Sequence, residues 1–293
     1  MIDGRTADGL RSRVRRLLRE IDCREPPVRI EDALEHLNLH RSYYNLENPT
    51  FVGRIVHRAK LTLRKLINVV AAIDLRGLWL PDENEVILAE GLPKPRVKYT
   101  TAHEIGHKLN PHHHAFFAVG DTALTLDPYY HEILEQEAHF AAGELIFMGD
   151  LFTRHAKDYE VGFDAVRDLG KRFDNSLAST LRRYVHHSSN KPLAALIGAP
   201  IWNGEDRDKV RHFVRNQFFD QLFPGVTSAH LLGQIETLVS PRRGGPVGEG
   251  EMNLADLNGA MHEFHWSSFF NQHDMLTLVV YRAPVRAMVG YGH

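Results

Sequence analysis

The sequence predicts an α+β fold, with a mostly helical N-terminal part that holds a small β-sheet and a C-terminal part that contains further strands. Apolar residues recur every three to four positions, as on one face of a helix, in residues 6–22 and within residues 129–148, and prolines bound a further helix over 96–110. Between residues 51 and 90 they alternate or run together, which is typical of strands. A strand-like texture returns after Pro192. Helices and strands of this kind together predict the α+β class.

The length of the chain, 293 residues, accommodates one to three domains. We expect a first domain over residues 1–160 and a helix-turn-helix-like segment over 161–190. The remainder, 191–293, is expected to form an α/β C-terminal domain with a sensor or docking role.

Composition limits the class of protein. Hydrophobic residues make up 43% and charged residues 25%, which is ordinary for a soluble protein with a real core. The net charge of -2 gives no general attraction to nucleic acid, so direct DNA binding would need a local basic patch. The lone Cys23 excludes an internal disulfide and fits a reducing compartment. With no signal-peptide pattern and no apolar run of ~18 residues, we expect a cytoplasmic protein without a membrane partner.

The N-terminal elements follow from their apolar spacing. Residues 6–22 place Leu10, Val14 and Leu17 on one face of an amphipathic helix whose back is basic. A short helix is expected after Pro26-Pro27, within residues 26–40. Strands are then expected at 51–57, 66–80 and 85–91, with a turn at residues 82–84 between the last two.

Prolines bound the central helices. Pro95 opens the helix over 96–110 and Pro111 closes it, because proline is tolerated only in a first helical turn. A histidine-rich loop is expected over 111–126. Asp127-Pro128 then begins the helix over 129–148.

The C-terminal half is expected to begin with two short helices around Asp174-Asn175. The remaining expectations are a strand over 193–202, a helix over 206–223, a flexible linker over 240–253 and a final strand over 274–290.

The helix over 96–110 contains His103-Glu104-x-x-His107, the pattern of a catalytic metal site. On a helix both histidines face one side and can reach a single ion, while Glu104 points toward water beside it. Gly106 would let a neighbouring segment approach closely. A shuffled chain of this composition would contain the pattern roughly 0.08 times, so the motif alone is only suggestive. The competing interpretation is a capping box of Thr101 with Glu104, which Pro95 disfavours by starting the helix earlier.

A third ligand is expected from the next helix. An apolar stripe that includes Ala138, Ala141 and Leu145 lets this helix lie against the His-Glu helix, and Glu135 sits at the edge of the stripe. Glu132 and His139 lie on roughly the same side and are the alternative ligands, and a solvated surface carboxylate is the structural alternative for Glu135.

Together the segments VKYTTAHEIGHKL and EQEAHFAAGELIF resemble the ImmA/IrrE family of metallopeptidases, and the resemblance covers about residues 10–187. It implies a zincin-like metallopeptidase core within residues 1–160. It also implies one Zn²⁺ per chain (or another divalent metal such as Mn²⁺) on His103, His107 and Glu135, with Glu104 as the catalytic base. The implied substrate is a protein, often a helix-turn-helix transcriptional repressor, cleaved in a stress or mobile-element response. The chain departs from the family pattern at Phe140, one position early, and at residues 146–150, where Leu-Met-Pro is common.

Two further features leave alternatives open. Residues 112–114, three histidines, are either a second metal site or pH-sensitive loop, or an exposed loop beside the helix. The pair around Asp174-Asn175 carries Arg182, Arg183, His186 and His187 on its second helix, and this helix either contacts DNA or packs against the core. The rival function is therefore a non-catalytic metal-binding regulator that binds DNA or a partner protein.

Overall fold

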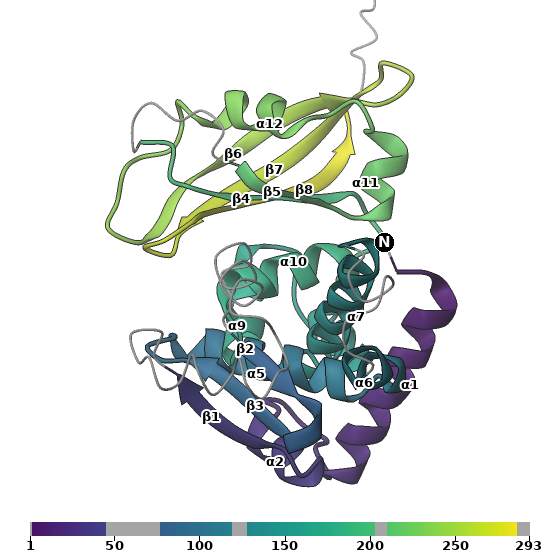
Figure 1. Ribbon diagram of the computed structural model, residues 1–293. Helices are drawn as coiled ribbons and strands as arrows, with labels where there is room; N and C mark the ends of the chain where they lie inside the picture. Colours follow the sequence, from purple (N-terminus) through teal and green to yellow (C-terminus); the bar gives the residue numbers. More distant parts are fainter. Residues whose placement is uncertain (1, 45–76, 119–127, 203–209, 286–293) are drawn as a thin grey trace, which may run out of the picture. The chain divides into compact units, whose positions relative to one another are not determined.

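The computed structural model describes residues 2–44, 77–118, 128–202 and 210–285, and it confirms the α+β class (Figure 1). The chain divides into two compact units, 1–151 and 152–293, which are described separately below. In the described part of the chain, no helix is long and apolar enough to cross a bilayer.

The first unit combines helices with a small three-stranded sheet. Its elements are α1 (Gly4–Glu20), α2 (Ile30–His36), β1 (His40–Tyr44), β2 (Gly77–Leu80), the 3-10 turn η1 (Pro81–Glu83), β3 (Glu85–Ala89), α5 (Lys94–Lys108), α6 (Pro111–Ala118) and α7 (Pro128–Ile146). Helix α8 (Asp150–Ala156) spans the boundary between the units. Asp3 caps α1 by accepting hydrogen bonds from the main-chain N–H groups of Arg5 and Thr6. The predicted amphipathic face is buried, including Leu10, Val14 and Leu17.

Strand β3 is the centre of the sheet, with β1 parallel to it and β2 antiparallel. The tight connection from β2 to β3 passes through η1 and Asn84, which adopts the left-handed conformation that asparagine tolerates. The strand predicted at 85–91 and the end of the one predicted at 66–80 are confirmed. The strand predicted at 51–57 and most of the 66–80 segment lie outside the described residues.

Helices α5 and α7 lie against each other at the two small residues that the sequence indicated. A Cβ at Gly106 would stand 2.7 Å from the Ala138 carbonyl oxygen, so only glycine permits this approach. Both helices have nearly the predicted bounds. The prediction of a loop after Pro111 is wrong, because α6 begins there: proline lacks only an N–H that a first helical turn leaves unused.

The second unit is a five-stranded antiparallel sheet with helices. Its elements are α9 (Phe163–Phe173), α10 (Leu177–His187), β4 (Leu193–Gly198), β5 (Val210–Arg215), α11 (Gln217–Leu222), α12 (Ser228–Ile235), β6 (Gly245–Ala255), β7 (Met261–Phe270) and β8 (Met275–Pro284). The strand order is β5-β4-β8-β7-β6. The strand predicted at 193–202 is confirmed as far as Gly198, because residues 199–202 form a bend and a turn, and the strand predicted at 274–290 is confirmed as β8 within its described part.

Helices cover both faces of this sheet (Figure 1). On one face, α11 and α12 bury Phe219 and Leu231 against a core that includes Phe264 and Trp266 of β7. On the other face, α10 packs against β4, whose six residues are all buried. Strand residues alternate between faces, so a strand buried throughout must be covered on both.

Two predictions in this unit are wrong. Residues 210–215, expected in a helix, form β5, and the helix α11 starts only after Asn216, whose side chain caps it. The expected linker at 240–253 contains the first part of β6. Its glycines serve packing: a Cβ at Gly250 would lie 3.2 Å from the indole nitrogen of Trp266.

The two predicted helices around Asp174 are confirmed as α9 and α10, joined through Asp174 in the left-handed conformation. Leu181, Tyr184 and Val185 of α10 are buried, while Arg182 is exposed. The second helix of the pair therefore packs against the C-terminal sheet through one face.

Candidate metal centre

Helix α5 presents two histidines one turn apart. His103 and His107 are both buried, and their Nε2 atoms lie 3.2 Å apart. Their rings meet nearly edge to face, with centroids 4.9 Å apart. The nitrogen atoms that can bind an ion therefore converge, as the His-x-x-x-His spacing predicted.

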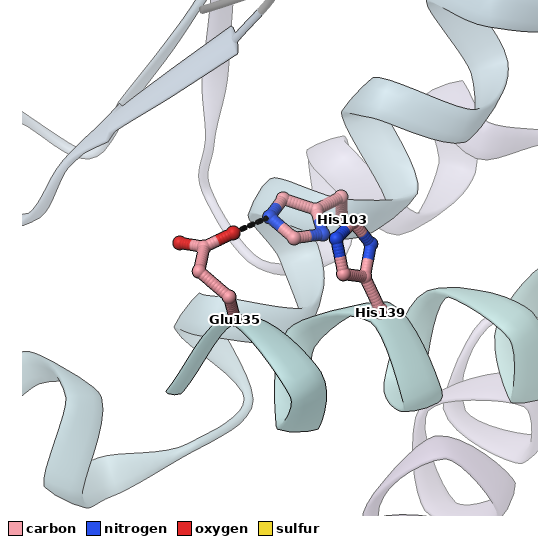
Figure 2. A group of neighbouring side chains, drawn as sticks. All are labelled: His103, Glu135 and His139. Carbon is pink, nitrogen blue, oxygen red and sulfur yellow. Dashed lines mark hydrogen bonds and ion pairs between the residues drawn. The ribbon is translucent and has the colours of Figure 1, made fainter. Parts of the chain in front are cut away.

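Helix α7 brings a carboxylate to the same point. Oε2 of Glu135 lies 3.1 Å from Nε2 of His103, and its Oε1 lies 3.4 Å from Nε2 of His107. Figure 2 shows Glu135 directed from α7 at the ring of His103. The close approach of the two helices at Gly106 makes this convergence possible.

These separations fit a four-coordinate ion. Zinc bonds of about 2.0–2.1 Å in a tetrahedron separate neighbouring ligand atoms by about 3.3 Å. The three distances among His103, His107 and Glu135 are 3.1, 3.2 and 3.4 Å. Two imidazole nitrogens and one carboxylate are also a common donor set of catalytic zinc sites, which leave a fourth position open.

The two alternative ligands, Glu132 and His139, differ in their position relative to the site. Glu132 is exposed and accepts a hydrogen bond from Gln136. His139 lies closer: it could form a ligand group with His103 and Glu135, whose ligand atoms all lie within 4.8 Å of one another. Its Nδ1 already pairs with the Tyr99 hydroxyl at 2.9 Å. We favour His107 over His139 as the partner of His103 and Glu135 because the distances involving His107 match the tetrahedral separation.

Glu104 is buried beside the histidines and held by the sheet. The main-chain N–H of Trp79 in β2 donates a hydrogen bond to its carboxylate. A Cβ at Gly77 would stand 2.8 Å from Oε1 of Glu104 and 2.5 Å from Cγ2 of Thr100. The strand thus passes so close to α5 that position 77 has no room for a side chain. The Thr101 capping-box alternative fails, because Thr101 and Glu104 both lie well inside α5.

Burial and mutual interactions shift the pKa values of the ionisable groups in the site. Burial raises the pKa of Glu104, and positive charge on His107 and His103 only partly opposes it. Burial would also raise the pKa of Glu135, but hydrogen bonds from His103 and His107 outweigh it and hold that pKa well below the ordinary value. Burial lowers the pKa of His103, yet its hydrogen bond to Glu135 and the nearby carboxylates leave that pKa raised. The carboxylate of Glu135 is therefore ionised at neutral pH, and it lies beside the imidazole of His103, whose pKa is raised.

A second cluster adjoins the first. Nε2 of His112 and Nε2 of His113 lie 2.7 Å and 2.9 Å from the same oxygen, Oε2 of Glu137. His113 is fully buried, so the expectation of a wholly exposed histidine loop is wrong for it. Burial lowers its pKa to about 2, assisted by positive charge on His107 and His112. The sequence did not single out Glu137 as a functional residue. The available signal was Pro111, because a proline can start a helix, and the helix that starts there determines where His113 points.

Comparison with known proteins gives a likeness of fold. No family model matches the sequence, and no curated protein matches it. Among solved structures, one described as a Mycobacterium tuberculosis transcriptional regulator is 11% identical, with a TM-score of 0.53. The match covers 94% of this chain and 80% of that one. At this identity the likeness concerns the fold alone.

Proposed function

We propose that this chain is a zinc-dependent endopeptidase of the ImmA/IrrE type that cleaves a regulatory protein at a specific site. The observation that carries the proposal is the triangle of His103, His107 and Glu135, with sides of 3.1 to 3.4 Å, formed beside the buried Glu104. The similarity of the two helix motifs to that family supports it. Mn²⁺ or another divalent ion of similar size would suit the same donor set.

The residues have separate roles. A bound zinc ion would supply the charge that polarises a peptide carbonyl and acidifies a water molecule. Glu104 takes the proton from the attacking water and returns it to the leaving amine. The N–H of Trp79 fixes the direction of the Glu104 carboxylate. A pKa raised by burial suits this task, because a general base works best when its pKa approaches the working pH.

The substrate that we propose is a helix-turn-helix transcriptional repressor, whose cleavage would release a stress or mobile-element response. This part rests on the resemblance of the motifs to the family. A protein substrate needs no general positive charge on the enzyme, which agrees with a net charge of -2.

One observation favours a second candidate function, a non-catalytic metal-binding regulator. The solved structure with a similar fold is described as a transcriptional regulator. In this alternative the metal centre would stabilise the fold, and the exposed Arg182 with Arg183 on α10 would contact DNA or a partner protein.

Replacement of Glu104 by glutamine separates the two. The amide is nearly isosteric but accepts no proton at neutral pH, so cleavage should fall at least ~100-fold while metal content is unchanged. Zinc-loaded wild-type and E104Q proteins are incubated with helix-turn-helix repressors from the same genome, beginning with any that a neighbouring gene encodes, and products are followed on gels and in a DNA-release assay. The regulator alternative instead expects release by E104Q with the repressor at full length, and loss of release on replacing Arg182 and Arg183 by alanine.

A further inference from the structure

His107 has a partner on the side of its ring that faces away from Glu135. Its Nδ1 lies 2.9 Å from Nδ1 of His113, on α6. Nε2 of His113 lies 2.9 Å from Oε2 of Glu137, on α7. His113 and Glu137 are both buried, so no solvent competes for these contacts. A continuous chain of hydrogen bonds therefore runs from a carboxylate on α7 through two imidazoles to the candidate metal centre.

The protons in this chain have only one arrangement that leaves His107 able to bind an ion. An ionised carboxylate only accepts hydrogen bonds, so Nε2 of His113 carries a proton and donates it to Glu137. Neutral His113 then has a lone pair on Nδ1, which accepts from the Nδ1–H of His107. Neutral His107 in turn keeps its lone pair on Nε2, the atom that faces His103 and Glu135.

We propose that Glu137 and His113 are positioning residues that hold His107 in the Nδ1–H tautomer, which presents Nε2 to the metal. The inference rests on the proposed metal centre. Partners that orient a ligand histidine through its second nitrogen typically strengthen metal binding by a factor of about 10–100. Here that partner is a histidine, and the carboxylate acts through it.

His113 and Glu137 could instead belong to a second metal site together with His112. The distances oppose it. Both histidine nitrogens lie 2.7 and 2.9 Å from one oxygen, below the about 3.3 Å that separates ligand atoms around a tetrahedral zinc ion, whereas the distances in the first site, 3.1 to 3.4 Å, lie around that value.

The positions of the protons on the two rings also oppose a second metal site. A metal on Nε2 of neutral His113 would leave the proton of that ring on Nδ1, so His107 would have to accept at its own Nδ1. The proton of His107 would then sit on Nε2 and block the first site. Only one of the two clusters can therefore use these neutral rings for a metal at a time.

Zinc affinity tests the inference without reference to cleavage. The full-length protein, freed of metal, is titrated with Zn²⁺ against a competing chelator. H113F keeps an aromatic ring but removes the acceptor, and we expect zinc affinity to fall about 10–100-fold. H113Q restores an acceptor for His107 and a donor for Glu137, so it should recover most of the loss. The matched control is H112Q, at the half-exposed partner of the same carboxylate, which should bind zinc within about twofold of the wild type.

A spectroscopic measurement reports the tautomer itself. In zinc-loaded protein labelled with nitrogen-15 histidine, we expect the Nδ1–H form for His107 and the Nε2–H form for His113. The H113Q variant assigns the His113 signals by deleting them. Where H113F fails to fold, E137Q decides in its place: its amide can donate as well as accept, so the tautomer is no longer dictated, and zinc affinity should fall about tenfold.

Three results would overturn the inference, and they differ from failure of the proposed function. Unchanged zinc affinity in a folded H113F protein, or an Nε2–H form of His107 in the zinc-loaded wild type, removes the positioning role and leaves the peptidase proposal standing. Two zinc ions per wild-type chain, with one lost in both H113F and H112Q, assign the cluster as a second metal site. Failure of the proposed function would give a different result: the wild-type protein would bind zinc, and H113F would bind it more weakly, but the wild type would cleave no repressor.

Discussion

The Nε2 atoms of the buried His103 and His107 face each other at 3.2 Å, and the partly exposed carboxylate of Glu135 lies within 3.4 Å of both. At most one proton fits between two such nitrogens, so the pair cannot both be protonated there without strong repulsion. A divalent cation at the same point satisfies both nitrogens and the carboxylate together. The arrangement is thus better suited to a metal than to a purely structural hydrogen-bond network.

We expect one zinc ion per wild-type chain and almost none in H103A after dialysis. Loss of one of three protein ligands should lower affinity by orders of magnitude. Metal analysis of the purified proteins measures this. H114A, which removes an exposed histidine of α6, is the matched control and should keep its metal. Equal metal content in wild type and H103A would refute the site.

The third ligand is tested by two carboxylates one turn apart on α7. E135A should lose zinc as H103A does, because Glu135 lies within 3.4 Å of both histidines. E132A should bind zinc normally, because Glu132 is exposed and pairs with Gln136. H139A should also keep the ion. A zinc-bound crystal structure with Glu132 or His139 on the metal and Glu135 in solvent would reverse the assignment.

Much of this centre could be predicted because its determinants are local. The spacing of His103 and His107 fixes their common face, and Pro95 fixes where α5 begins. Gly106 and Ala138 are small, which indicated the close approach of α5 and α7 that the structure contains. Periodicity, proline and small residues act over a few positions, and a single sequence displays them directly.

The parts that could not be predicted depend on contacts between distant residues. The local sequence around Gly250 predicts a linker, but Gly250 lies in β6 and pairs with Trp266 of the next strand. The indole of Trp266 lies where a side chain at position 250 would begin, so glycine fits this strand position. His113 reads as part of an exposed loop, yet Glu137, 24 positions later, pairs with it in the interior. Neither partner is visible from the local pattern, because pairing of this kind is decided by tertiary packing.

Zinc affinity should depend on pH in a way set by His103. A proton on this imidazole competes with the metal, and interactions with Glu135 and Glu104 raise its pKa above 6.5. Affinity should therefore be full above the raised pKa and fall about tenfold per pH unit below it. Glu135 adds no dependence there, because its pKa is lowered and it stays ionised. Chelator competition at a series of pH values measures the curve, and a decline that starts only below pH 6.5 would contradict the raised pKa.

The last prediction concerns the contact that brings Glu135 to the histidines. Alanine in place of a helical glycine ordinarily stabilises by roughly 0.5–1 kcal/mol. At Gly106 the new Cβ would meet the Ala138 carbonyl oxygen at 2.7 Å, and overpacking costs about 1–3 kcal/mol, so we expect G106A to be destabilised by about 1–2 kcal/mol.

Gly143 on α7 is the matched control, because a Cβ there meets no atom of the described residues within 4 Å. G143A should gain stability by about 0.5–1 kcal/mol and bind zinc as the wild type does. Denaturant unfolding of the metal-free proteins measures both changes. G106A should in addition bind zinc more weakly, because the helix that carries Glu135 is pushed away from His103. Equal stability gains in the two variants would show that α5 and α7 do not approach each other as closely at Gly106 as the structure has them.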